Sequence, residues 1–207
     1  MDIIYDSSFN LAAIPAATTL AAAEAKTYTV GRQVDGWALL GSTGAVQVQA
    51  SNDNFVTTVY DSGMVYASDV PSRQVQAVNA ATWRVLAVTA ASVGLLYVGT
   101  TQKTRDPTYP YSFERAVNSR DRQTLGGATW SISGYTARQG SWSINAIRQV
   151  EADAWRSLYD ATAGFRRGFV VRVDGLVYLV KAPSKILLLD RIAPDVFSLQ
   201  LPVEEIV

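Results

Sequence analysis

The chain has 207 residues, of which 48% are hydrophobic and 17% are charged, and its 18 basic residues balance its 18 acidic ones. This composition excludes a disordered chain, and the even charge balance gives no reason to expect nucleic acid as a partner. Cysteine and histidine are both absent. Their absence excludes disulfides, thiolate nucleophiles, thiolate or imidazole metal ligands and a Ser-His-Asp triad.

The N-terminal part carries no export or membrane signal that we recognise. Its first residues, MDIIYDSS, lack the basic region of a signal peptide. The apolar run over residues 12–25 is interrupted by Pro15, two threonines and Glu24, so we do not expect it to span a membrane. We expect a soluble protein that is made and folded without export.

Residues 1–100 are expected to form short strands separated by turns. Residues 2–5 are a strand candidate, and the alanine-rich residues 20–26 are predicted to form one or two helical turns, because alanine is the best helix former. Seven further strands are expected, about ten residues apart, at residues 28–30, 36–40, 45–50, 57–60, 75–78, 82–88 and 95–99. Such spacing, with turn residues between the runs, is typical of a sandwich or jelly roll.

A polar stretch with two prolines, TQKTRDPTYP at residues 101–110, is the best linker candidate. It divides the chain into an expected domain over residues 1–105 and a second over residues 106–207. After the linker we expect strands at residues 112–117, 129–133 and 141–147, with turns at Gly126-Gly127 and Gln139-Gly140.

One helix is predicted over residues 150–163, because apolar residues recur there at helical spacing and Gly164 follows as a stop. The apolar face is expected to contain Val150, Ala154, Trp155, Leu158 and Ala161. Next, Asp174-Gly175 between two strand-like runs, residues 168–173 and 176–181, predicts a hairpin. Strands at residues 185–189, 196–201 and 203–207 are expected to complete the chain.

Residues 46–63, VQVQASNDNFVTTVYDSG, contain a polar interruption that invites two interpretations. Asn52, Asp53 and Asn54 carry oxygens that could hold a cation or a sugar. The same residue types are ordinary turn formers, and a single carboxylate is too little for tight metal binding. We expect a turn and no metal site.

Aromatic side chains could stack on a sugar if they lay beside that loop. Trp37 and Tyr66 are the candidates, whereas Trp83 and Tyr97 lie in apolar strands and are expected in the core. A sugar-binding site would require Trp37 or Tyr66 to be exposed next to Asn52, Asp53 or Asn54.

Arginines are frequent in the middle of the chain, and they end in the pair Arg166-Arg167. They are consistent with a subunit interface or with a solvated face, and the sequence does not separate the two. No acidic pair is marked out by spacing, and Gly126-Gly127 lacks the context of a phosphate loop. We therefore expect no enzyme, nominate no catalytic residue and expect no cofactor.

Two resemblances rest on these residues. The segment VQVQASNDNFVTTVYDSG, followed by ATWRVLAVTAASVGLLYVGT, resembles the galactose-binding-like jelly roll. Over most of the chain, MDIIYDSSF, SGYTARQGSWSINAIRQVEADAWRSLYDATAGFRRGFVVRVDG and LQLPVEEIV resemble distal tail or minor tail-tip proteins of long-tailed bacteriophages. In those proteins a β-barrel comes first in the chain and the accessory β-domain follows it or is inserted in it. Here the jelly-roll segment precedes most of the residues expected to form the barrel.

The second resemblance implies a split β-barrel with a flanking helix, which packs side by side with copies of itself into a ring, usually a hexamer, beneath the tail tube. The expected partners are further copies and other tail proteins: tube, hub and tape measure. The expected location is the virion tail, after synthesis in the host cytoplasm. A C-terminal edge strand containing Glu204, Glu205 and Ile206, together with Arg166 and Arg167, is the candidate subunit interface.

Two other functions stay open from the sequence. A carbohydrate-binding module that attaches a particle or an enzyme to a cell-surface glycan would use the loop and the exposed aromatics. A small hydrolase would need two acids facing each other across a cleft, and no pair can be named.

Overall fold

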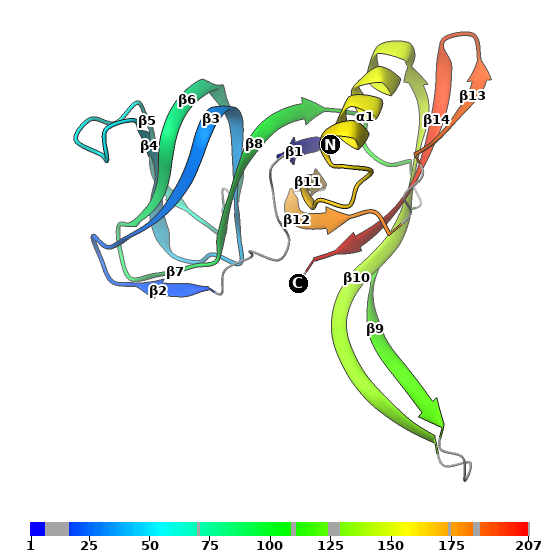
Figure 1. The fold of residues 1–207 in the computed structure, drawn as a ribbon, viewed down its shortest axis with the longest axis horizontal. Helices are drawn as coiled ribbons and strands as arrows, with labels where there is room; N and C mark the ends of the chain where they lie inside the picture. Colours follow the sequence, from blue (N-terminus) through cyan, green and yellow to red (C-terminus); the bar gives the residue numbers. More distant parts are fainter. Residues whose placement is uncertain are drawn as a thin grey trace. The chain divides into compact units, whose positions relative to one another are not determined.

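The computed structural model describes residues 1–6, 17–69, 71–108, 111–123, 129–173, 175–183 and 187–206, with the backbone alone for residues 116–123, 129–136 and 188. The described chain is mainly β, with one helix, and every strand pairing recorded in it is antiparallel (Figure 1). The prediction of a mainly β protein with one helix is thus confirmed. Two compact units are formed: Met1–Thr104 with Phe169–Tyr178, and Arg105–Gly168 with Leu179–Val207.

The first unit contains one long run of paired strands, in the order β5-β4-β6-β3-β8-β1-β11, and a separate pair, β2 with β7. Their bounds are β1 Asp2–Tyr5, β2 Thr18–Leu20, β3 Ala25–Leu40, β4 Ala45–Ser51, β5 Tyr60–Tyr66, β6 Ser72–Ala87, β7 Ala91–Val93, β8 Leu95–Lys103 and β11 Phe169–Val173.

The antiparallel pair of β3 and β6 organises the core of this unit. Each strand has 16 residues, and the register between them shifts twice, near Gly31, which has φ +64°, and again before Gly36. Such bulges bend a strand pair and increase its twist. The two ends consequently pair with different neighbours, β6 with β4 and β3 with β8, and contribute Trp83 and Trp37 to one hydrophobic cluster. Both rings are fully buried, and so is Tyr97, as expected for Trp83 and Tyr97.

Strand β11 belongs to the first unit although it lies far along the sequence. It pairs with β1 through Ile3 and Val171, while the other edge of β1 pairs with β8. The side chains of Ile3, Val170 and Val171 are at most 1% exposed. The N-terminal strand is therefore enclosed by two strands distant from it in sequence.

The second unit contains β9 Ser112–Gln123, β10 Thr129–Arg148, α1 Gln149–Ala161, β13 Leu188–Ala193 and β14 Val196–Glu205. Strand β12, Leu176–Lys181, enters it at Leu179. One edge of β14 pairs with β10, and its other edge pairs with β13 and then with β12. The expectation that the C-terminal strand is a free edge is wrong, because β14 has partners on both sides.

Helix α1 begins at Gln149, and a capping interaction stabilises its start: the Glu151 side chain accepts a hydrogen bond from the backbone N–H of Arg148 at 2.9 Å. It ends at Ala161, and three residues later Gly164, whose φ is +72°, donates its N–H to the Tyr159 carbonyl at 2.8 Å. The buried face consists of Ala152, Trp155 and Leu158. Val150, predicted on that face, is 81% exposed, because two residues turn a helix by about 200° and so place Val150 on nearly the opposite side from Ala152.

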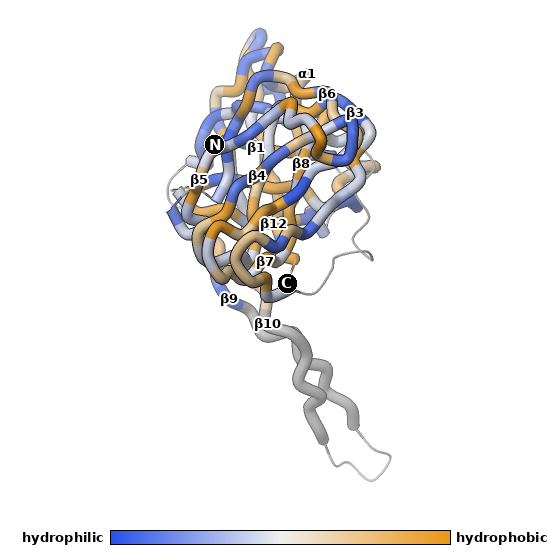
Figure 2. The backbone as a smooth tube through the Cα atoms, turned by 90° about the vertical axis from the view of Figure 1, so that its left-hand side faces the viewer, coloured by the Kyte–Doolittle hydropathy of each residue, from blue (hydrophilic) through white to orange (hydrophobic). Residues whose placement is uncertain are grey.

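Along several of the described strands, hydrophobic and hydrophilic residues alternate, as expected for strands with one buried and one solvent-facing side (Figure 2).

Three local predictions are wrong. Residues 20–26 form the end of β2, a turn and the start of β3, because pairing of Ala25 with Leu86 outweighs the helix preference of alanine. Gln139-Gly140 lies inside β10, and most of residues 57–60 precede β5, which starts at Tyr60. The predicted turn at Gly126-Gly127, Asp174 of the predicted hairpin, and Lys185 lie outside the described residues. No helix in the described ranges is long and apolar enough to cross a membrane.

Candidate functional site

The loop after β4 is held together by its own polar side chains. The Ser51 hydroxyl donates to Asp53 Oδ1 at 2.7 Å and accepts from the Phe55 N–H at 2.9 Å. The Thr57 N–H and hydroxyl both donate to the Asp53 carboxylate, at 2.9 and 2.5 Å. The Thr57 hydroxyl, its N–H and the Ser51 hydroxyl together lower the pKa of Asp53 to about 2. The carboxylate oxygens of Asp53, which could have held a ligand, are thus already hydrogen-bonded within the loop.

Asn52 ties this loop to strand β6. Its side-chain oxygen accepts from the Ala81 N–H at 2.8 Å, and its amide nitrogen donates to the Asn79 carbonyl at 3.1 Å. Two residues of the loop, Asn54 and Phe55, have positive φ, and this backbone conformation turns the chain through a tight corner. Among the described residues, no three acidic side chains gather as a metal site would need.

The aromatic candidates do not join this loop. Trp37 is fully buried, and its Nε1 donates to the Tyr60 hydroxyl at 2.9 Å. Tyr66 is 52% exposed, but it pairs with Ala45, whereas the loop follows Ser51 at the opposite end of β4. The structure therefore does not assemble Trp37, Tyr66 and the loop into one sugar-stacking site.

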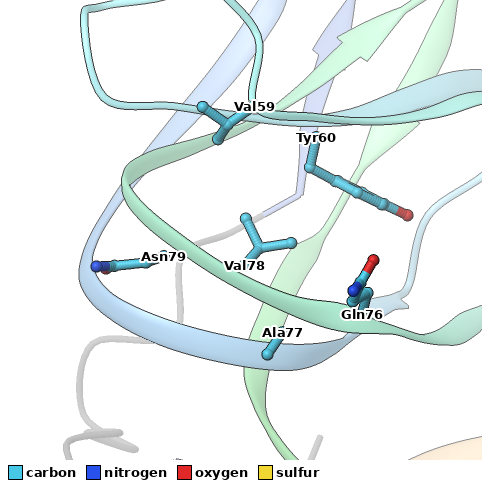
Figure 3. A pocket seen from close by; sticks show the side chains of 6 residues that line it. All are labelled: Val59, Tyr60, Gln76, Ala77, Val78 and Asn79. Atoms are coloured by element: carbon cyan, nitrogen blue, oxygen red, sulfur yellow. The ribbon is translucent and has the colours of Figure 1, made fainter.

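A groove of about 490 Å³ runs beside the loop. It is lined by residues that precede and begin β5 and by the middle of β6: Val59, Tyr60, Gln76, Ala77, Val78 and Asn79. The side chains of Val78 and Gln76 point toward the segment that carries Val59 and Tyr60 (Figure 3). The groove exists because β4 ends opposite Thr82, so this part of β6 extends beyond it. Sequence reasoning missed the groove, since strand lengths and register create it.

A polar network lies on the outer face of β4 and β6. The Arg84 guanidinium stacks on the Phe55 ring at 4.0 Å, and its Nε donates to Gln49 Oε1 at 2.8 Å. The Gln49 amide nitrogen in turn donates to Asp61 Oδ2 at 2.7 Å. Gln49 is only 7% exposed, so this buried amide is fully engaged. The alternation of valine and glutamine in β4 signalled an outward Gln49, but nothing signalled its partners.

The predicted subunit-interface residues have different environments. Arg166 is exposed, whereas Arg167 Nη1 donates to the Ala161 carbonyl near the end of α1 at 3.4 Å. Glu204 forms an ion pair with Lys181 at 3.4 Å, and the Glu205 carboxylate accepts from the Arg138 N–H at 3.3 Å. The Ile206 N–H donates to the Leu179 carbonyl at 2.8 Å. These contacts lie within the second unit, and a role between subunits stays a prediction.

The most unusual element of the second unit is the ribbon of β9 and β10. Strand β10 has 20 residues, but its pairing with β14 begins only at Gln139. Its earlier residues, from Thr129 to Ala137, pair with β9 alone (Figure 1). At about 3.4 Å per residue, this two-stranded ribbon is about 30 Å long.

Comparison with known proteins leaves the family open: no protein-family model, no curated protein and no solved structure matches the chain.

Proposed function

We propose that this protein is a structural component of the tail tip of a long-tailed bacteriophage, and that copies of it assemble side by side into a ring. The observation that carries this proposal is the two-stranded ribbon formed by residues 116–123 and 129–137. A two-stranded hairpin is marginally stable in water unless a third strand or another layer covers it. A neighbouring copy in a ring would provide that cover.

The finer architecture belongs to the same proposal. The first unit would be a jelly roll of the galactose-binding-like type, and the second a split β-barrel with α1 at its flank. The long antiparallel run of strands in the first unit supports it, and so does the packing of α1 on the paired strands β10 and β14 in the second. Ring closure requires a heterologous contact whose rotation divides the circle, and a hexamer is the number that the resemblance to distal tail proteins implies.

The proposed partners are further copies of the chain and the tail proteins above and below the ring, in a virion tail assembled in the host cytoplasm. We propose neither catalysis nor a cofactor. The rival function, attachment to a cell-surface glycan, would need exposed aromatics beside the loop, and the buried Trp37 gives it no support.

The deciding experiment compares two chains by light scattering after size exclusion, over a concentration series. One is the native chain, and in the other residues 118–135 are replaced by Asn-Gly, which closes the ribbon at the Val117–Thr136 pair with a two-residue turn. We expect a closed oligomer for the native chain and a folded monomer for the shortened one. Asp53→Ala, in the other unit, serves as a control that should leave assembly intact.

An oligomer that survives the shortening would contradict the role of the ribbon. A native chain that stays monomeric at every concentration would weaken the ring proposal, and a glycan array would then be the next test. Circular dichroism of the shortened chain distinguishes lost assembly from lost folding.

A further inference from the structure

The outer face of the first unit presents an arginine that the fold holds in a fixed orientation. One face of the Arg84 guanidinium lies on the Phe55 ring at 4.0 Å. Its Nε is fixed by Gln49 at 2.8 Å, and Gln49 is itself fixed by Asp61 at 2.7 Å. The long side chain has therefore lost most of its rotational freedom before any partner arrives, which lowers the entropic cost of a further contact.

The two terminal nitrogens of the guanidinium, Nη1 and Nη2, remain available for a further hydrogen-bond acceptor. No partner among the described residues binds Arg84 Nη1 or Nη2, and the side chain is half-buried at the surface. Two parallel N–H groups on a planar guanidinium match the two oxygens of a carboxylate. The acid nearest in this network, Asp61, is turned to Gln49 and also accepts from the Gly63 N–H at 2.8 Å. An incoming carboxylate would thus complete the set of contacts around Arg84.

Beyond the glutamines Gln47 and Gln49, this face carries apolar side chains that are at least partly exposed. Leu86 follows Arg84 by two positions on β6, so both lie on the same face, and Gln47 pairs with both Leu86 and Met64. Met64 is 55% exposed and Tyr66, two residues on, is 52% exposed. Methionine, tyrosine and arginine are the residue types enriched at the centres of protein interfaces.

We propose that this face, formed by Arg84, Leu86, Met64 and Tyr66, binds an acidic segment of another protein. An aspartate or glutamate of that segment accepts two hydrogen bonds from the Arg84 fork, and its apolar neighbours pack on Met64 and Tyr66. A protein carboxylate is favoured over a sugar acid because the Phe55 ring face, on which a sugar would stack, is covered by Arg84. This surface lies in the first unit and does not depend on ring assembly.

The test uses two blocked peptides, Thr-Leu-Glu-Leu-Thr and its matched Gln form, together with free glucuronate, titrated into the full chain. Binding is followed by NMR at the Arg84 Nε–H signal and the Met64 methyl group. We expect saturable shifts with the Glu peptide, and binding about tenfold weaker with the Gln peptide, because one charge-assisted hydrogen bond or more is lost. Arg84→Lys should weaken binding of the Glu peptide similarly, because an ammonium cannot form the bidentate pair.

Arg73→Lys is the matched control, since Arg73 is an exposed arginine of the same unit whose Nη1 contacts the Ser62 carbonyl at 3.1 Å. It should bind the Glu peptide as the native chain does. Met64→Glu provides a second variant that leaves the Arg84 network intact, and it should weaken binding about tenfold by charge repulsion and lost apolar contact. Equal binding of the two peptides, native affinity in both Arg84→Lys and Met64→Glu, or glucuronate binding as tightly as the Glu peptide would overturn the proposal.

Discussion

Asp53 illustrates how a residue suited to ligand binding can serve the fold instead. It is exposed, yet its carboxylate accepts from the Thr57 N–H and hydroxyl and from the Ser51 hydroxyl. These donors are within four residues of it in sequence, so the corner is largely locally determined. The same residue types in an open loop would have kept their oxygens for a ligand.

The Asp53 contacts predict a dependence of stability on pH. Because the pKa of Asp53 is about 2 in the folded chain and 3.8 for an unperturbed aspartate, its contribution is fully present above pH 4 and is lost as pH falls toward 2. Asp53→Asn should melt below the native chain at pH 6, with a difference that shrinks as pH falls from 4 toward 2. Thermal unfolding at several pH values measures this, and a constant difference would contradict it.

The two buried tryptophans of the first unit should respond differently to the same substitution. Trp37 Nε1 donates to the Tyr60 hydroxyl, whereas Trp83 Nε1 is buried without a hydrogen-bond partner among the described residues. Trp37→Phe should therefore cost about 1 kcal/mol more than Trp83→Phe, since only the first breaks a hydrogen bond. Urea unfolding compares the two, and in a Tyr60→Phe background the difference should largely disappear.

At the scale of elements, the position of a strand in its sheet decides what the strand can do. The terminal strand β14 pairs with β10 on one edge and, over most of its length, with β13 and β12 on the other, so it is not a free edge strand. Replacing Ile206 by Pro would remove the N–H that donates to the Leu179 carbonyl, and would therefore weaken the unit itself. The ribbon of β9 and β10 has the open edges that the C-terminal strand lacks.

The base of that ribbon depends on a close approach of two backbones. A Cβ at Gly140 would lie 1.8 Å from the Ser112 carbonyl oxygen, so β9 and β10 could not keep their spacing. Gly140→Ala should destabilise the chain by about 2–3 kcal/mol, as overpacking does. Ser141→Ala, the next residue along β10, should change stability by less than about 0.5 kcal/mol. Chemical denaturation measures both, and equal effects would contradict the explanation.

At the scale of the whole chain, the two units are interleaved in sequence. Phe169–Tyr178 belongs with Met1–Thr104, because β11 pairs with β1. The division expected from the linker, residues 1–105 and 106–207, puts β11 in the second domain, whereas in the structure β11 belongs to the first unit.

This interleaving predicts how a fragment should behave. Residues 1–105 alone would keep β8 but lose β11, the second partner of β1, with its buried Phe169, Val170 and Val171. With each buried side chain contributing about 1.5–3 kcal/mol, the fragment should melt at least about 10 °C below the same fragment fused to residues 168–178. Circular dichroism melting of both fragments makes the comparison, and equal melting temperatures would contradict it.

Local chemistry made parts of the molecule predictable from sequence. The helix, its Gly164 stop and most strands of the first unit follow from periodicity and turn residues over a few positions. The burial of Trp83 and Tyr97 followed from their apolar neighbours. The helical turns expected at residues 20–26 failed because pairing of Ala25 with Leu86, 61 residues away, outweighed local preference.

By itself, the sequence determined the class: mainly β, one helix, no cysteine or histidine chemistry, and a polar corner after β4. Tertiary structure alone decided that Trp37 is core, that β14 is internal, that β11 joins the first unit, and that Arg84 meets Phe55 and Gln49. The physical reason is the distance along the chain over which each kind of interaction acts. Periodicity and turn chemistry act over a few residues, whereas strand order and register are set by pairings between segments tens to more than a hundred residues apart.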